Sequence, residues 1–111
     1  AVYRLKDSNK DIELLIVGDG ELKTELENYT NNLNVENITF FGRRNDDSHF
    51  FWRAADLFVL PGLGGLAISE AMCYSLPVLC GIADGCEKDL VTTKNGFIVE
   101  DMTEENLIKY I

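Results

Sequence analysis

Short uninterrupted runs of apolar residues alternate along this chain with longer segments whose apolar residues are spaced for a helix. The runs end at turn-forming residues and predict buried strands over residues 13–17, 37–41, 57–60, 77–80 and 96–99. Apolar positions three and four residues apart predict helices over 20–33, 48–55 and 65–75, a helical turn at 87–91 and a terminal helix capped by Thr103. Strands that are apolar on both faces and alternate with helices indicate an α/β, Rossmann-like three-layer domain with a parallel sheet.

Most of the glycines lie in the turns that leave these predicted strands. Right-handed crossovers bring such turns to one edge of a parallel sheet. Ligands of open α/β sheets bind beyond the carboxyl ends of the strands, at that edge. The glycine-bearing turns are at 18–20, 42–44, 61–65 and 81–85.

The turn with the most glycines reads Gly62-Leu63-Gly64-Gly65-Leu66 and directly precedes a predicted helix. Free N–H groups of the first helical turn, together with the helix dipole, favour an anion there, and missing side chains let a phosphate approach the backbone. The alternative is that the glycines only permit a sharp turn. We therefore name Gly62, Gly64, Gly65 and Leu66 as candidate binding residues.

Glu70 is the only charged residue between Asp56 and Asp84. Its predicted helix is apolar almost all round, so we expect that helix to be buried. An unpaired carboxylate inside it would cost several kcal/mol or take up a proton. A ligand with vicinal hydroxyls, such as a ribose, would offer Glu70 two donors. The alternative is a carboxylate that faces solvent or accepts from a nearby backbone N–H.

Three further turns carry weaker signals. Residues 18–24, Gly-Asp-Gly-Glu-Leu-Lys-Thr, satisfy neither the dinucleotide nor the triphosphate glycine motif, so Gly18 either shapes a turn or supports a ligand. Gly42 and Arg43 follow a strand, where an arginine suits a phosphate or base as well as solvent. Asp84-Gly85-Cys86-Glu87 is explained equally by a sugar contact and by a capped turn.

Composition narrows the class of protein. A length of 111 residues fits one domain, and a net charge of −9 without a basic cluster argues against nucleic acid and anionic membranes as partners. Three cysteines, no CxxC pair and a single histidine predict neither a zinc site nor a disulfide framework, and favour reduced thiols in the cytoplasm. No stretch is long and apolar enough to span a bilayer.

Four stretches in this order resemble a known family: LLIVGDGELKTELE, ITFFGRR, ADLFVLPGLGGLAISEAMCYSLPVLC and GCEKDLVTTKNGFIVE. Together they are similar to the C-terminal, donor-binding half of GT-B glycosyltransferases of the retaining family 4 type, the glycosyl transferases group 1. The resemblance covers essentially all of the chain, and the block from the glycines through Glu70 to Pro77-Val78 is its most specific part.

The resemblance implies a nucleotide-sugar site without a metal or another cofactor. Glu70 would bind the ribose hydroxyls, and the backbone of Gly64, Gly65 and Leu66 would bind the diphosphate. Gly42 and Arg43 would lie near the nucleobase, and Gly18 near the phosphates or the sugar. The full-length enzyme would transfer a hexose from a nucleoside-diphosphate sugar to a glycan or lipid-linked acceptor, in cell-surface polysaccharide synthesis.

Two departures from the family concern catalysis. The family's second glutamate stands eight positions before Glu70, where this chain has Gly62, so we assign no catalytic residue. The basic residues that relatives use on the diphosphate, and the acceptor-binding N-terminal half, lie outside this sequence. We therefore expect residues 1–111 to be one nucleotide-sugar-binding domain of a larger glycosyltransferase, cytoplasmic or peripheral to the membrane, and inactive alone.

Two other functions compete with this interpretation. Nucleotide-sugar 2-epimerases share the GT-B architecture, but they use a histidine-rich site and this chain has only His49. A non-catalytic α/β module of the receiver type would carry a phosphoacceptor Asp at the end of a middle strand, where this chain has Leu60-Pro61-Gly62. Both observations favour the transferase.

Overall fold

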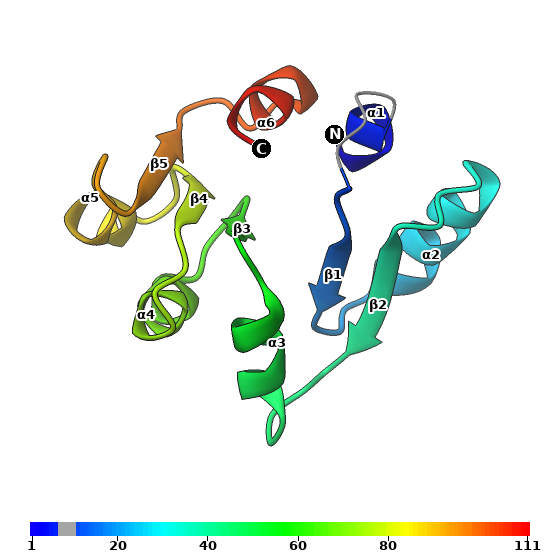
Figure 1. Cartoon of the computed structure of the whole chain (residues 1–111), viewed down its shortest axis with the longest axis horizontal. Coiled ribbons are helices and arrows are strands. Elements are labelled where there is room, and N and C mark those ends of the chain that lie inside the picture. The colour runs from blue at the N-terminus through cyan, green and yellow to red at the C-terminus, as the bar shows by residue number, and fades with distance from the viewer. Residues whose placement is uncertain (7–10) are drawn as a thin grey trace. The chain divides into compact units, whose positions relative to one another are not determined.

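The computed structural model describes residues 1–6 and 11–111, which form two compact units, residues 1–48 and residues 49–111. We call them the N-terminal unit and the C-terminal unit. Each has its own sheet of parallel strands, as the ribbon shows (Figure 1).

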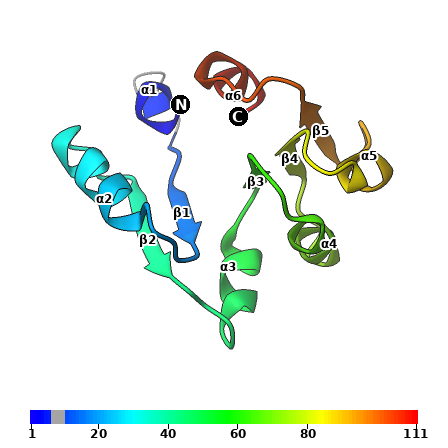
Figure 2. The same ribbon diagram turned by 180° about the vertical axis from the view of Figure 1, so that it is seen from behind.

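The N-terminal unit is built on two parallel strands. Its elements are α1 (Val2–Lys6), β1 (Leu14–Val17), α2 (Lys23–Asn32) and β2 (Ile38–Gly42). The pairing starts with Leu14 opposite Ile38. Just before it, the Asn37 side-chain amide donates to the Ile12 carbonyl at 2.7 Å and fixes the register. Helix α2 runs beside the strand pair in both views (Figures 1 and 2).

The C-terminal unit holds a three-stranded parallel sheet in the order β3-β4-β5. Its elements are α3 (Ser48–Ala54, of which the first residue still belongs to the N-terminal unit), β3 (Phe58–Leu60), α4 (Gly65–Cys73), β4 (Val78–Gly81), α5 (Cys86–Leu90), β5 (Gly96–Val99) and α6 (Glu104–Tyr110). All four residues of the central strand β4 are buried, as expected for a strand with a neighbour on both edges.

The core of the C-terminal unit lies where α4 packs against β3 and β4. Its fully enclosed members are Ile68, Ala71, Leu76, Val78, Cys80 and Val91. An aromatic group flanks it: the Trp52 ring meets Phe58 edge-on at 5.1 Å and stacks near Tyr74 at 6.3 Å between centroids. This core fixes the position of the turn that leaves β3.

The predicted alternation of strands and helices is confirmed, with each element boundary displaced by a few residues at most. Thr103 caps α6 as expected, since its hydroxyl oxygen accepts from the Asn106 backbone N–H at 3.3 Å. The α/β class with parallel strands is confirmed as well. In the part of the chain that the structure describes, no helix has both the length and the apolar character needed to cross a membrane.

One expectation about α4 is wrong: the helix is not buried all round. Ile68 and Ala71 face the core, but Leu66 is 90% exposed and Glu70 is exposed too. Apolar composition alone did not distinguish a helix enclosed on all sides from one that rests a single face on a sheet. Glu70 therefore faces solvent, and burial does not explain it.

Candidate functional site

The turn between β3 and α4 has a backbone that requires glycine. Gly64 is the N-cap of α4 and has a φ of 155°, a conformation that side chains disfavour. At Gly65, an added Cβ would lie 2.5 Å from the Cys86 sulfur, so this backbone is in close contact with the segment after β4. Gly62 differs, because a Cβ there would meet nothing within 4 Å.

The same turn leaves two backbone N–H groups available. The Gly64 carbonyl accepts from the N–H groups of Ala67 at 3.0 Å and Ile68 at 3.2 Å. Within residues 1–6 and 11–111, the N–H groups of Gly65 and Leu66 donate to no acceptor. Free N–H groups at the positive end of a helix attract an anion.

Glu70 lies on the exposed face of α4. It follows Leu66 by four residues, so both side chains project from one side of the helix. The Glu70 carboxylate forms no hydrogen bond or ion pair with any described residue. The predicted positions Gly62, Gly64, Gly65, Leu66 and Glu70 thus lie on one turn and the helix face that continues it. Gly62, Leu66 and Glu70 are exposed, and Gly64 and Gly65 are half-buried.

The other predicted positions lie together in the N-terminal unit. The Gly18 N–H donates to the Gly42 carbonyl at 2.8 Å, so the turns after β1 and β2 are hydrogen-bonded to each other. Gly42 is buried, with the Lys23 ammonium beside it. Arg43 is exposed and lines a shallow depression of about 290 Å³ with Asp19 and Gly20. Arg43 is therefore the predicted residue best placed to meet a ligand in this unit.

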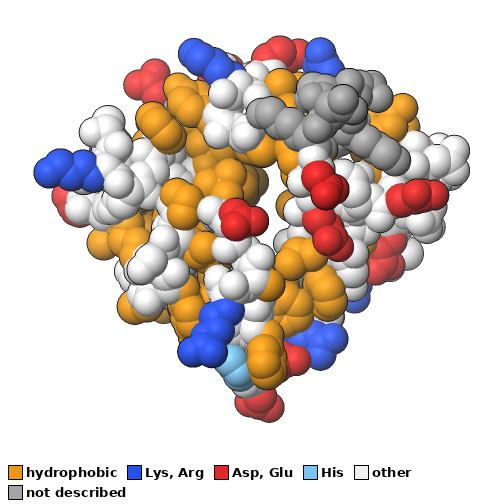
Figure 3. All heavy atoms as spheres, in the orientation of Figure 1, with side chains coloured by type: hydrophobic (Ala, Val, Ile, Leu, Met, Phe, Trp, Pro, Cys, Tyr) orange, Lys and Arg blue, Asp and Glu red, His pale blue; other side chains and the backbone are white. Residues whose placement is uncertain are grey.

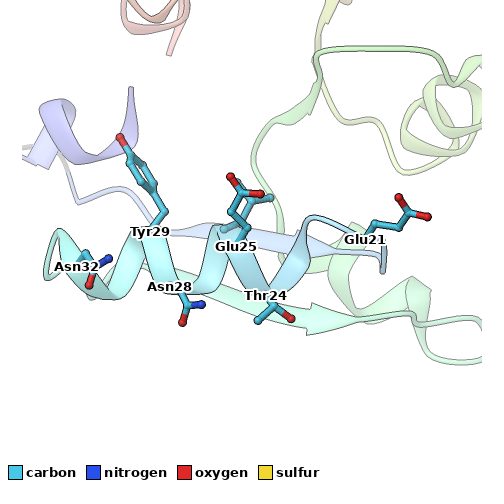
Figure 4. Close-up of a pocket in the computed structure, with 7 residues that line it drawn as sticks. Glu21, Thr24, Glu25, Asn28, Tyr29 and Asn32 are labelled. Carbon is cyan, nitrogen blue, oxygen red and sulfur yellow. The ribbon is translucent and has the colours of Figure 1, made fainter.

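A second, larger depression of about 790 Å³ follows the outer surface of α2 (Figure 4). Its lining consists of Glu21, Thr24, Glu25, Leu26, Asn28, Tyr29 and Asn32. Two carboxylates and no basic group make it a poor place for a phosphate. None of the predicted binding residues lies there.

Glu87 belongs to the segment for which the sequence left a sugar contact and a capped turn open, and the structure buries its carboxylate. Its side chain is 1% exposed, and its two oxygens accept from the backbone N–H groups of Ala83 at 3.1 Å and Gly85 at 3.0 Å. The hydrogen bond from Ala83 contributes most to holding the pKa of Glu87 below its ordinary value of 4.5. The capped turn, one of the two explanations left open for this segment, is what the structure shows.

These bonds also bear on metal binding. Ligand atoms of Asp84, Cys86 and Glu87 lie within 4.8 Å of one another, a spacing that would suit an ion. Both Glu87 oxygens already accept backbone hydrogen bonds, however, and the Asp84 carboxylate accepts from the Cys86 N–H at 3.3 Å. The carboxylates of Asp84 and Glu87 are thus engaged in shaping the loop.

The lowered pKa of Glu87 predicts an acid-dependent loss of stability. A carboxylate whose pKa is lower in the folded state stabilises that state above its unfolded value of 4.5, and this contribution is lost as the pH falls through the folded pKa. We expect the difference in unfolding free energy between wild type and Glu87→Gln to be constant from about pH 5 to 7. It should shrink below pH 4.5. Urea unfolding over this pH range measures it, and a pH-independent difference would contradict the assignment.

Both acidic and basic side chains are visible on the surface that Figure 3 shows. Arg44 pairs with Asp47 at 3.2 Å, and Lys23 lies 4.0 Å from Glu27. Lys23 and Arg44 thus each have a carboxylate close by, which weakens their attraction for an anion.

A family model and two curated relatives match this chain, and all three are glycosyltransferases. The glycosyl transferases group 1 family matches residues 1–111. An uncharacterised glycosyltransferase of Haemophilus influenzae is 34% identical over 104 residues, which cover 89% of this chain and 29% of that protein. The UDP-Gal:α-D-GlcNAc-diphosphoundecaprenol α-1,3-galactosyltransferase of Escherichia coli is 36% identical over 95 residues, covering 81% of this chain and 24% of that enzyme.

Among solved structures, the glycosyltransferase WaaG, involved in lipopolysaccharide biosynthesis, shares the fold. Its TM-score is 0.69 at 22% identity, over 98% of this chain and 40% of WaaG. The predicted Rossmann-like fold is therefore confirmed. The chain spans 24–29% of the length of the two curated relatives described above.

Proposed function

This chain belongs to the glycosyl transferases group 1 family, and from that premise we propose that it is the donor-binding domain of a GT-B glycosyltransferase. The full-length enzyme transfers a hexose from a nucleoside-diphosphate sugar to a glycan or lipid-linked acceptor, with retention of anomeric configuration. A separate N-terminal domain binds the acceptor. Residues 1–111 alone bind the donor nucleotide without transferring its sugar.

The observation that carries this proposal is the pair of free N–H groups on Gly65 and Leu66 at the start of α4. These N–H groups lie at the positive end of a nine-residue helix, and this end attracts an anion that lies beside the turn. Gly64 and Gly65 let the backbone of this turn pack closely against the side chains of Leu60 and Cys86, which holds the two N–H groups in place. This end of α4 binds the diphosphate of the donor, and the exposed Gly62 lies at its margin.

Glu70 binds the ribose of the donor nucleotide in this proposal. It is exposed and has no partner among the described residues, so its carboxylate is available to accept from two ribose hydroxyls. It follows Leu66 by four residues, about 6 Å along the helix axis. The phosphates and the ribose of one nucleotide therefore find their partners on one face of α4.

The N-terminal unit is considered by itself. Its exposed Arg43, directly after β2, is available to meet a nucleobase or a phosphate, and buried Gly42 gives that turn its shape. The Gly18 N–H is already bonded to the Gly42 carbonyl, so Gly18 offers a ligand only its bare backbone.

Two observations support the proposed acceptor and the proposed cellular compartment. The name of the Escherichia coli relative describes a UDP-galactose donor and a diphosphoundecaprenol-linked acceptor, which favours lipid-linked intermediates of cell-surface polysaccharides for this family member too. Cys73, Cys80 and Cys86 are all free, which suits a reducing compartment such as the cytoplasm. The proposal needs no metal or other cofactor, because the helix end and basic side chains stabilise the phosphate charge.

Replacing Glu70 by alanine tests the proposal. Calorimetric titration of the wild-type protein with UDP, GDP and ADP should show millimolar or tighter binding of one of them. Because hydrogen bonds to a carboxylate contribute about 1.5–3 kcal/mol, we expect Glu70→Ala to weaken that binding about tenfold or more.

Asp56→Ala is the matched control for Glu70→Ala. Asp56 is also an exposed carboxylate of the C-terminal unit, but it precedes β3 and so lies at the opposite end of that strand from the glycine turn. Its removal should leave nucleotide affinity unchanged. Equal effects of the two substitutions, or no binding of any nucleotide by the wild type, would refute the donor site.

A further inference from the structure

Glu87 is buried, ionisable and unused by the proposed binding site. Only 1% of the residue is exposed, so it offers no surface to a ligand. Its two oxygens nevertheless bridge two N–H groups of the loop between β4 and α5, those of Ala83 and Gly85. A buried charge held this way fixes the loop, because each N–H would lose its partner if the loop moved.

The loop held by Glu87 is in direct contact with the glycine turn. An added Cβ on Gly65 would lie 2.5 Å from the Cys86 sulfur, so the Cys86 side chain rests on the first residue of α4. At the start of the loop, an added Cβ on Gly81 would lie 2.8 Å from the Pro61 carbonyl oxygen. The two segments therefore touch at both ends of the glycine turn.

These contacts form a continuous path from Glu87 to the free N–H groups of α4. Glu87 bonds the residues on both sides of Asp84, and Asp84 in turn accepts from the Cys86 N–H at 3.3 Å. The Cys86 side chain in turn contacts Gly65. The Gly65 N–H has no acceptor among the described residues. Binding groups on a loop need such support, since a small misplacement weakens their interactions.

From this arrangement we infer that Glu87 is a positioning residue for the donor diphosphate: through Cys86 it holds Gly65 and Leu66 where their N–H groups bind phosphate. The inference rests on the proposed function, and it adds a residue on α5 that touches no ligand. The low pKa of Glu87 agrees with it, because the carboxylate stays ionised and accepts both bonds at neutral pH.

Glu87→Gln tests the inference, with UDP and uridine as probes. The glutamine amide keeps one acceptor oxygen and presents an NH₂ group to the other backbone N–H, so one loop bond is lost. We expect UDP affinity, measured by NMR titration, to fall about fivefold. Uridine, which lacks phosphates, should bind the variant and the wild type equally. In the absence of ligand, the amide signals of Gly65 and Leu66 should shift.

Asp89→Asn is the matched control, because Asp89 is an exposed carboxylate on the same helix α5. It should change neither the UDP affinity nor the amide signals of the glycine turn. If Glu87→Gln weakens UDP and uridine equally, or leaves the Gly65 and Leu66 signals in place, Glu87 has only a structural role. If the wild type binds UDP and Glu87→Gln binds it as tightly, the inference fails while the proposed function stands.

A second pair of variants keeps the test decisive if Glu87→Gln does not fold. Gly65→Ala should weaken UDP binding, since the new methyl group displaces Cys86. Adding Cys86→Ala removes the sulfur and should restore much of the affinity, because the Cys86 Cβ lies 3.5 Å from the added atom, an ordinary contact. Failure of the double variant to recover would show that the turn is not supported through Cys86.

Discussion

Ile68→Ala is expected to lower the unfolding free energy by about 2–5 kcal/mol, the range for removing a large aliphatic side chain from a packed core. Ile68 is 2% exposed and belongs to the cluster that joins α4 to the sheet of the C-terminal unit. Such a loss is a large fraction of the roughly 5–15 kcal/mol that stabilises a typical domain. Urea unfolding followed by circular dichroism measures it.

Leu66→Ala is the control on the same helix. Leu66 is 90% exposed, so its truncation should change the unfolding free energy by less than about 0.5 kcal/mol. The contrast between two leucine-sized side chains, two positions apart, reports which face of α4 rests on the sheet. Similar losses at both positions would mean that α4 is enclosed on all sides, contrary to the structure.

Leu66→Asp should weaken nucleoside-diphosphate binding by about 10- to 100-fold, because it places a carboxylate beside the free N–H groups proposed to bind the phosphates. The protein should remain folded, since the side chain is exposed and an acidic residue in the first turn of a helix is favourable. The loss should diminish at high salt, which screens the repulsion.

Leu66→Asn separates charge from shape, because asparagine has nearly the size of aspartate without its charge. We expect it to bind the nucleotide close to the wild-type level. Calorimetric titrations of both variants at low and high ionic strength provide the comparison. If the two variants lose affinity equally, the diphosphate does not lie at the start of α4.

The strands and helices were predictable because their signals are local. Val78, Leu79 and Cys80 form an uninterrupted apolar run behind Pro77, and the structure buries all three in the central strand. Thr103 precedes an acidic first turn and caps α6 as its sequence context indicates. Which strands pair is not local: the described residues form two sheets, β1-β2 and β3-β4-β5.

The surroundings of the candidate site were less predictable. An apolar helix containing Leu66, Ile68 and Ala71 was expected to be enclosed, yet only the last two face the core. Glu70 was singled out for supposed burial and is exposed. Its proposed role now rests on its availability to a ligand. The direction in which α4 faces depends on packing with β3 and β4, which no short window of sequence contains.

Glu87 shows the opposite case, a buried charge that looked ordinary in the sequence. Its partners are the backbone N–H groups of Ala83 and Gly85. Because nearly every residue has a backbone N–H, such partners leave no mark in a sequence, and only the short Asp-Gly-x-Glu spacing indicated a capped turn. The contact of Cys86 with Gly65 joins positions 21 residues apart and left no such signal.

Binding of a donor diphosphate at the start of α4 can be mapped by following the backbone amide signals during titration with UDP, GDP and ADP. One nucleotide should produce saturable shifts concentrated at Gly64, Gly65 and Leu66, extending to Glu70. The corresponding nucleoside should shift Glu70 without the glycine amides. If millimolar concentrations of all three leave these amides unmoved, or shift only residues outside 62–70, the donor diphosphate does not bind at the start of α4.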